Sequence, residues 1–129
     1  MHINDISVLI IDDSDHIRAL FAMTMTRAGV TRCHQAKNGE EGVRMFRELR
    51  PTIVFLDNML PLLSGMEVLR QIKETDPKSV VVMISGASNI ETIKEAKEAG
   101  AAHYIIKPYS AGKVVEVMTK LLSLEGSAV

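Results

Sequence analysis

The chain has 129 residues, of which 47% are hydrophobic and 24% charged, and its formal net charge is −1. We expect a single domain over residues 1–129, which can bury a core without disulfides or a structural metal. The charge gives no basic field for nucleic acid or a membrane surface. No apolar run approaches the roughly 20 residues that cross a bilayer, residues 1–5 do not resemble a signal peptide, and Cys33 is the single cysteine. We therefore expect a cytoplasmic protein without direct contact to nucleic acid or membrane.

Five short runs are predicted to be β-strands. They cover residues 7–11, 31–36, 53–56, 79–84 and 102–106. The runs at 7–11 and 53–56 are almost wholly apolar, which indicates strands buried on both faces. The run at 31–36 is more polar and fits a position at or near the edge of a sheet. Residues 79–84 form the most β-prone run in the chain.

A helical pattern follows each predicted strand. The expected capping residues are Ser14 or Asp15, Asn38, Ser64, Ser88 and Ser110, and the second, third and fourth of these helices have a glutamate three residues after the cap. The apolar face expected for the first helix contains Ile17, Leu20, Phe21, Thr24 and Ala28. The fourth helix has few large apolar side chains. Strands that alternate with crossover helices predict an α/β fold with a parallel sheet covered on both faces.

Polar side chains follow four of the five predicted strands. Asp12 and Asp13 follow the first strand, Asp57 the third, Ser85 the fourth and Lys107 the fifth. Because the carboxyl ends of parallel strands lie at one edge of the sheet, we expect these side chains to meet there. Each residue alone has an ordinary explanation in a turn or at a strand end. Their coincidence at one edge indicates a functional site.

Three clustered carboxylates need a compensating cation, since each pair about 4 Å apart costs about 4 kcal/mol at an effective dielectric near 20. Carboxylate oxygens in a small site that admits water suit Mg²⁺. A carboxylate beside Mg²⁺ can act as a nucleophile towards phosphorus. The ion, a lysine ammonium and a serine hydroxyl can then hold the phosphoryl oxygens. These residues therefore favour phosphoryl transfer with Mg²⁺ as cofactor.

The polar residues belong to motifs that occur in order with characteristic spacing. These are Ile11-Asp12-Asp13-Ser14, Leu56-Asp57 with Pro61 and Gly65, Ser85-Gly86-Ala87, and Tyr104 with Lys107-Pro108. With them, residues 8 to about 122 resemble a response-regulator receiver domain of two-component signalling, and especially its single-domain, chemotaxis-like members. The resemblance implies a doubly wound, flavodoxin-like fold with five parallel strands in the order 2-1-3-4-5.

The resemblance also implies roles for the acidic residues. Asp57 matches the phospho-acceptor, and Asp13 the direct Mg²⁺ ligand beside it. Asp12 matches the acid that holds the metal through water, and Met59 stands where a main-chain carbonyl completes the metal site. Met59 and Ala87 occupy two positions that are often polar in this family, which bears on the rate of dephosphorylation.

Further matches concern the switch and the loops. Ser85 matches the switch hydroxyl, Lys107 the phosphoryl-binding lysine, and Tyr104 the aromatic residue that changes rotamer with the switch. The positions that match loop-shaping residues are Pro61, Gly65 and Pro108.

The function implied by the resemblance is a signalling switch that catalyses only its own phosphoryl transfer and slow dephosphorylation, and is otherwise not an enzyme. Asp57 would take a phosphoryl group from a histidine kinase, a phosphotransfer protein or a small phosphodonor. A downstream target protein would then bind the face formed by the fourth helix, fifth strand and fifth helix. Lysines cluster in this part of the chain, at Lys94, Lys97, Lys107 and Lys113.

Two other interpretations compete with this one. A receiver-like module that works without phosphorylation usually lacks part of the acid, serine and lysine set, which is complete here. A small α/β enzyme or flavin binder would need other residues. A phosphatase with an aspartate nucleophile would want a second acid where Met59 stands, and a flavin phosphate would be repelled by Asp12 and Asp13.

Overall fold

A computed structural model describes residues 1–125 of the chain. Within these residues, five parallel strands form one sheet in the order β2-β1-β3-β4-β5. The strands are β1 (Ser7–Ile11), β2 (Arg32–Ala36), β3 (Ile53–Asp57), β4 (Val81–Ser85) and β5 (His103–Ile106). The helices are η1 (Ile3–Asp5), α1 (Asp15–Ala28), α2 (Gly39–Leu49), α3 (Gly65–Thr75), α4 (Ile90–Glu98) and α5 (Ala111–Leu122). The predicted doubly wound α/β fold and its strand order are confirmed.

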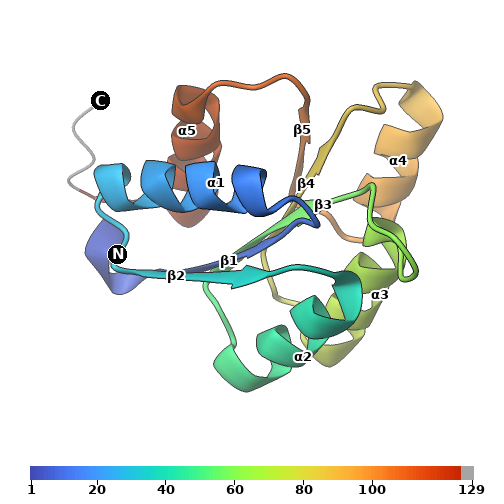
Figure 1. Cartoon of the computed structure of the whole chain (residues 1–129), viewed down its shortest axis with the longest axis horizontal. Coiled ribbons are helices and arrows are strands. Elements are labelled where there is room, and N and C mark those ends of the chain that lie inside the picture. The colour runs from blue at the N-terminus through green and yellow to red at the C-terminus, as the bar shows by residue number, and fades with distance from the viewer. Residues whose placement is uncertain (126–129) are drawn as a thin grey trace.

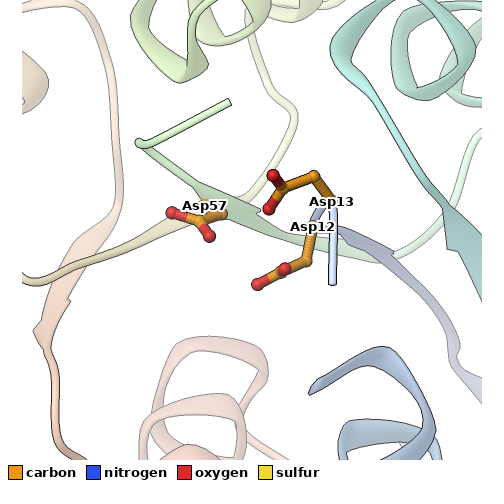
Figure 2. A group of neighbouring side chains, drawn as sticks. All are labelled: Asp12, Asp13 and Asp57. Atoms are coloured by element: carbon orange, nitrogen blue, oxygen red, sulfur yellow. The ribbon is translucent and has the colours of Figure 1, made fainter. Parts of the chain in front are cut away.

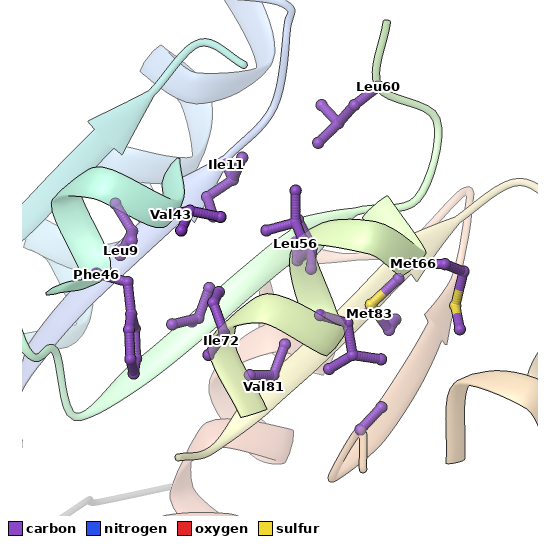
Figure 3. Close-up of a cluster of buried hydrophobic side chains, with 14 of the residues drawn as sticks. Leu9, Ile11, Val43, Phe46, Leu56, Leu60, Met66, Ile72, Val81 and Met83 are labelled. Atoms are coloured by element: carbon purple, nitrogen blue, oxygen red, sulfur yellow. The ribbon is translucent and has the colours of Figure 1, made fainter. Parts of the chain in front are cut away.

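The helices form a layer on each face of the sheet (Figure 1). Side chains alternate along a strand, so Leu9 and Ile11 of β1 face α2, α3 and α4, whereas Val8 and Ile10 face α1 and α5. Each face has its own apolar cluster, and Figure 3 shows the one beneath α2 and α3. No helix in residues 1–125 is long and apolar enough to cross a membrane.

Four of the five predicted helix caps are confirmed. The side chains of Ser14, Asn38, Ser64 and Ser110 each accept a hydrogen bond from the main-chain N–H three residues later. The prediction that Ser88 caps α4 was wrong, because Asn89 accepts the bond from Thr92 N, at 2.8 Å. Asparagine caps as well as serine does, so the sequence pattern alone did not separate these neighbours.

Three predicted strands begin too early in the sequence. The strands β2, β4 and β5 start at Arg32, Val81 and His103, one or two residues after the predicted starts. A strand begins where its neighbour offers a pairing partner, and the β3–β4 register starts only at Val54 and Val81. At their other ends, β3 and β4 extend one residue further than predicted, to Asp57 and Ser85.

The predicted buried face of α1 was partly wrong. Leu20 is 47% exposed, whereas Met25 is fully buried and Arg18 is only 9% exposed. Phe21 sets the orientation of the helix, because its ring packs on Phe55 of β3 with 4.9 Å between ring centroids. The buried face, which contains Arg18, Phe21 and Met25, is displaced by one residue from the predicted stripe. The sequence pattern did not separate the two faces, because Leu20 and Met25 are both apolar.

Candidate functional site

Three carboxylates meet at the carboxyl ends of two neighbouring strands. Asp12 and Asp13 follow β1 directly, and Asp57 is the last residue of β3, which pairs with β1 up to Ile11 and Leu56. One carboxylate oxygen from each acid lies within 4.8 Å of the others. Asp12 and Asp57 are buried and Asp13 is exposed. Figure 2 shows the three side chains grouped at this edge, so the predicted acidic cluster is present.

The loop after β3 holds Asp57 in place through its main chain. Met59 N donates a hydrogen bond to Asp57 Oδ1, at 2.9 Å, and Asn58 N donates to Ile84 O of β4, at 3.0 Å. The loop returns so closely that a Cβ atom on Gly65 would lie 2.5 Å from both Asn58 Cα and Asp57 O. Only glycine fits there, which supports the loop-shaping position predicted for Gly65.

Two further residues of the predicted set lie beside the acids. Lys107 reaches across from the end of β5, and its Nζ donates a hydrogen bond to Asp57 Oδ2 at 3.1 Å. Its main-chain N–H bonds to Ser85 O, at 2.8 Å, and a cis peptide joins it to Pro108. Ser85 itself is fully buried at the end of β4. Although partial burial acts to lower the pKa of Lys107, the bond to Asp57 and the charges of Asp57 and Asp12 raise it above its ordinary value.

The electrostatics of the cluster favour a bound cation. Burial raises the pKa of Asp12 to about 6. A hydrogen bond from Ser14 N to Asp12 Oδ1, at 2.8 Å, lowers this pKa, whereas the charge of Asp57 raises it. Burial and the neighbouring carboxylate of Asp57 thus both disfavour the charged form of Asp12, and a bound cation would counteract both effects. Carboxylate oxygens are also the ligands that Mg²⁺ prefers, so the residues present fit this ion.

Both predicted switch residues contact Ala87. Ser85 Oγ accepts a hydrogen bond from Ala87 N, at 3.0 Å, and the Tyr104 hydroxyl donates one to Ala87 O, at 2.9 Å. The Tyr104 ring is only 8% exposed. A single residue in the loop before α4 therefore connects the site serine with the buried tyrosine.

The expected output face carries charges of both signs. Lys94 and Lys113 are exposed, and their Nζ atoms lie 4.0 Å from Oε1 of Glu98 and Glu116, respectively. Burial, and then the charges of Lys113, Lys97 and Lys120, lower the pKa of His103 on β5, whereas the charge of Glu116 raises it. Outside this face, the residue Met59, which follows Asp57 in the loop after β3, is 68% exposed.

Arg18 is a site residue that the sequence analysis missed. Its Nη1 donates a hydrogen bond to the main-chain carbonyl of Asp12 at 2.6 Å, and its Nη2 pairs with Asp15. The spacing of Asp15 and Arg18 suits an ion pair on one helix face, but no sequence pattern predicts that the guanidinium is buried at the end of β1.

Comparisons with known proteins agree with this geometry. Residues 8–119 match the family model of the response regulator receiver domain. The chemotaxis protein CheY of Thermotoga maritima is 33% identical over 114 residues, which are 88% of this chain and 95% of that protein. The transcriptional regulatory protein AfsQ1 of Streptomyces coelicolor is 34% identical over 93% of this chain and 52% of its own length.

Solved structures show the same likeness. A CheX–CheY–BeF₃–Mg complex from Borrelia burgdorferi contains a chain with a TM-score of 0.87 and 29% identity, which covers 91% of this chain and 89% of its own length. The BeF₃-activated DrrB receiver domain has a TM-score of 0.82 and 28% identity, and the match covers 95% of this chain and 99% of that domain. The chain belongs to the family of response regulator receiver domains.

Proposed function

We propose that this chain is a phospho-accepting signalling switch in which Asp57 receives a phosphoryl group with the help of Mg²⁺. The observation that carries the proposal is the setting of Asp57. Its carboxylate is buried at the end of β3, next to Asp12 and Asp13 from β1, and one of its oxygens is bonded to Lys107 from β5. The donor is a histidine kinase, a phosphotransfer protein or a small molecule such as acetyl phosphate.

The reaction is a displacement at phosphorus. A carboxylate oxygen of Asp57 forms a bond to the phosphorus atom, while the bond to the donor's nitrogen or oxygen breaks and the leaving group keeps the electron pair. Lys107 already bonds to Asp57 Oδ2, so its cationic ammonium is placed to hold a phosphoryl oxygen once the acyl phosphate forms. Hydrolysis by water later returns the carboxylate and inorganic phosphate.

The proposed metal ligands rest on the acidic cluster together with the resemblance to the receiver family. Asp13 and Asp57 would bind Mg²⁺ directly, Asp12 would hold it through water, and the Met59 carbonyl would complete the set. When bound, the ion neutralises charge on the phosphoryl oxygens. The presence of BeF₃ and Mg in the Borrelia burgdorferi CheY complex supports this choice of ion.

The signal would leave the site through Ala87. If the Ser85 hydroxyl turns to donate to a phosphoryl oxygen, its bond from Ala87 N weakens and the loop before α4 is free to shift. Tyr104 bonds to the carbonyl of that same residue, so its rotamer and the position of α4 respond together. A target protein would read this change on the face formed by α4, β5 and α5.

This proposal places the protein in the cytoplasm, where histidine kinases present their phosphoryl groups, and assigns it no reaction on a separate substrate. A module that works without phosphorylation would not need Asp12, Asp13, Asp57, Ser85 and Lys107 together at one edge. The complete set therefore favours the phosphorylated switch.

The direct test is intact-mass spectrometry after incubation with acetyl phosphate and Mg²⁺. The wild-type chain should gain one phosphoryl group, and Asp57→Asn should gain none. Asp5→Asn, which changes an exposed acid in η1 away from the site, is the matched control and should react like the wild type. Equal labelling of Asp57→Asn, or labelling in excess chelator, would refute the proposal.

A further inference from the structure

Arg18 is a charged residue that is buried in the first turn of α1. Only 9% of the residue is exposed, and a buried guanidinium requires strong hydrogen-bond partners. Asp15 supplies one of them, but its side chain is 93% exposed, so solvent screens this ion pair. The other partner is the main-chain carbonyl of Asp12, at 2.6 Å from Nη1. The contact that is better shielded from solvent is thus the one to the main chain of Asp12.

The carbonyl of Asp12 lies at the point where β1 becomes the metal-binding turn. Asp12 N is held by Ala36 O of β2, at 3.1 Å, and the Asp12 side chain by Ser14 N, at 2.8 Å. Arg18 holds the remaining polar group of the same residue. The three contacts, made by β2, the turn and α1, fix the main chain on entry to Asp13.

The direction of the Asp13 side chain depends on that main chain. Within residues 1–125, no hydrogen bond or ion pair to the Asp13 carboxylate is found, and the residue is exposed. Its carboxylate nevertheless lies within 4.8 Å of those of Asp12 and Asp57. A ligand without contacts of its own is aimed by the backbone that carries it.

We propose that Arg18 is a positioning residue for metal binding, which fixes the turn that presents Asp12 and Asp13 to a divalent cation. The inference rests on the proposed Mg²⁺ site and adds to it a residue that touches neither the ion nor the phosphoryl group. Arginine suits this task because its planar fork bonds two partners in a fixed geometry and keeps its charge.

Charge and positioning predict opposite effects when Arg18 is replaced. Loss of a buried positive charge beside three carboxylates would, by Coulomb's law, strengthen the binding of a cation. Loss of the fixed turn would weaken it, because the carboxylates would have to be ordered on binding. The sign of the change in Mg²⁺ affinity therefore separates the two roles.

The experiment is a calorimetric titration of Mg²⁺ into the wild type, Arg18→Met, Arg18→Lys and Asp15→Asn. Arg18→Met should bind Mg²⁺ about tenfold more weakly, a loss typical of residues that orient metal ligands. Arg18→Lys keeps the charge without the fork and should fall between this variant and the wild type. Asp15→Asn removes only the exposed partner and should bind almost as the wild type does.

A second readout excludes a general structural defect. The rate of Asp57 phosphorylation by acetyl phosphate should need about tenfold more Mg²⁺ for half-saturation in Arg18→Met and should return to the wild-type rate at saturating Mg²⁺. Equal or tighter Mg²⁺ binding by Arg18→Met overturns the proposal. If Arg18→Met does not fold, the Mg²⁺ affinity of Arg18→Lys is the test. An affinity equal to that of the wild type would then overturn the proposal. A wild-type chain that binds no Mg²⁺ refutes the proposed function instead.

Discussion

The helices α3 and α4 cover the same face of the sheet, but they are attached to it very differently. α3 buries four large apolar side chains, those of Met66, Val68, Leu69 and Ile72. α4 buries only Ala96, and its first residue, Ile90, is 81% exposed. Because apolar burial supplies most of the free energy that holds a helix on a sheet, α4 can move at a far lower cost than α3.

This difference matches the positions of the two helices relative to the site. α3 begins at Gly65, which packs against the main chain of Asp57 and Asn58 and so shapes the loop that carries the acceptor. α4 begins after the loop in which Ala87 is bonded to Ser85 and Tyr104. The firmly packed helix builds the site, and the weakly packed helix is available to report its state.

The largest expected effect compares one isoleucine from each helix. Ile72→Ala in α3 should lower the free energy of unfolding by about 2–5 kcal/mol, because it leaves a cavity in a fully buried position. Ile93 of α4 is only partly buried, and Ile93→Ala should cost about 1 kcal/mol. Urea denaturation of both variants gives the two values. Equal losses would contradict the difference in packing.

The buried carboxylate of Asp12 should make the stability of the chain depend on pH. The pKa of Asp12 rises from an ordinary 3.8 to about 6 on folding, so the folded chain binds a proton more tightly between these values. Without divalent cations, the contribution of Asp12 to the free energy of unfolding should therefore fall by up to about 3 kcal/mol as the pH rises from about 4 to about 6, and level off above that.

Asp12→Asn removes this titration and should be more stable than the wild type at pH 7 in chelator. Urea denaturation at several pH values, with and without Mg²⁺, tests both statements, because Mg²⁺ should stabilise the wild type more than the variant. A difference in the free energy of unfolding between the wild type and Asp12→Asn that stays constant from pH 4 to pH 6 would contradict this account of Asp12.

The smallest expected effect concerns the loop between Asp57 and α3. Hydrolysis of the acyl phosphate needs a water aligned opposite the aspartate oxygen, and a polar side chain can orient it. Met59 and Ala87 cannot, so the phosphorylated chain should be long-lived, and Met59→Asn should shorten its lifetime severalfold. Mass spectrometry after removal of the donor gives both decays, with Met23→Asn on α1 as the exposed-methionine control. Equal decay in Met59→Asn and the wild type would show that this side chain does not control the lifetime.

The parts of the molecule that were predicted from sequence rest on local signals. Alternating strands and helices predicted a parallel α/β sheet, and the acids, serine and lysine after four strands predicted the site, because parallel strands must end at one edge. The strand order came from the resemblance to the receiver family. The start of α4 was missed by one residue, since Ser88 and Asn89 are both good caps. The burial of Arg18 and the shared contact at Ala87 could not be predicted, because they depend on which way the side chains of α1 and β5 turn and which main-chain carbonyls they reach.

The central claim is that a phosphoryl group on Asp57 changes α4 and leaves α3 in place. Backbone amide NMR of the ¹⁵N-labelled chain, with Mg²⁺ and with or without the phosphoryl mimic beryllofluoride, tests it most directly. We predict shifts at residues 86–98 that extend along α4, little change from Val68 to Thr75, and loss of the α4 shifts in Ser85→Ala. Shifts confined to the loops around Asp57, or α4 shifts that persist in Ser85→Ala, would contradict the claim.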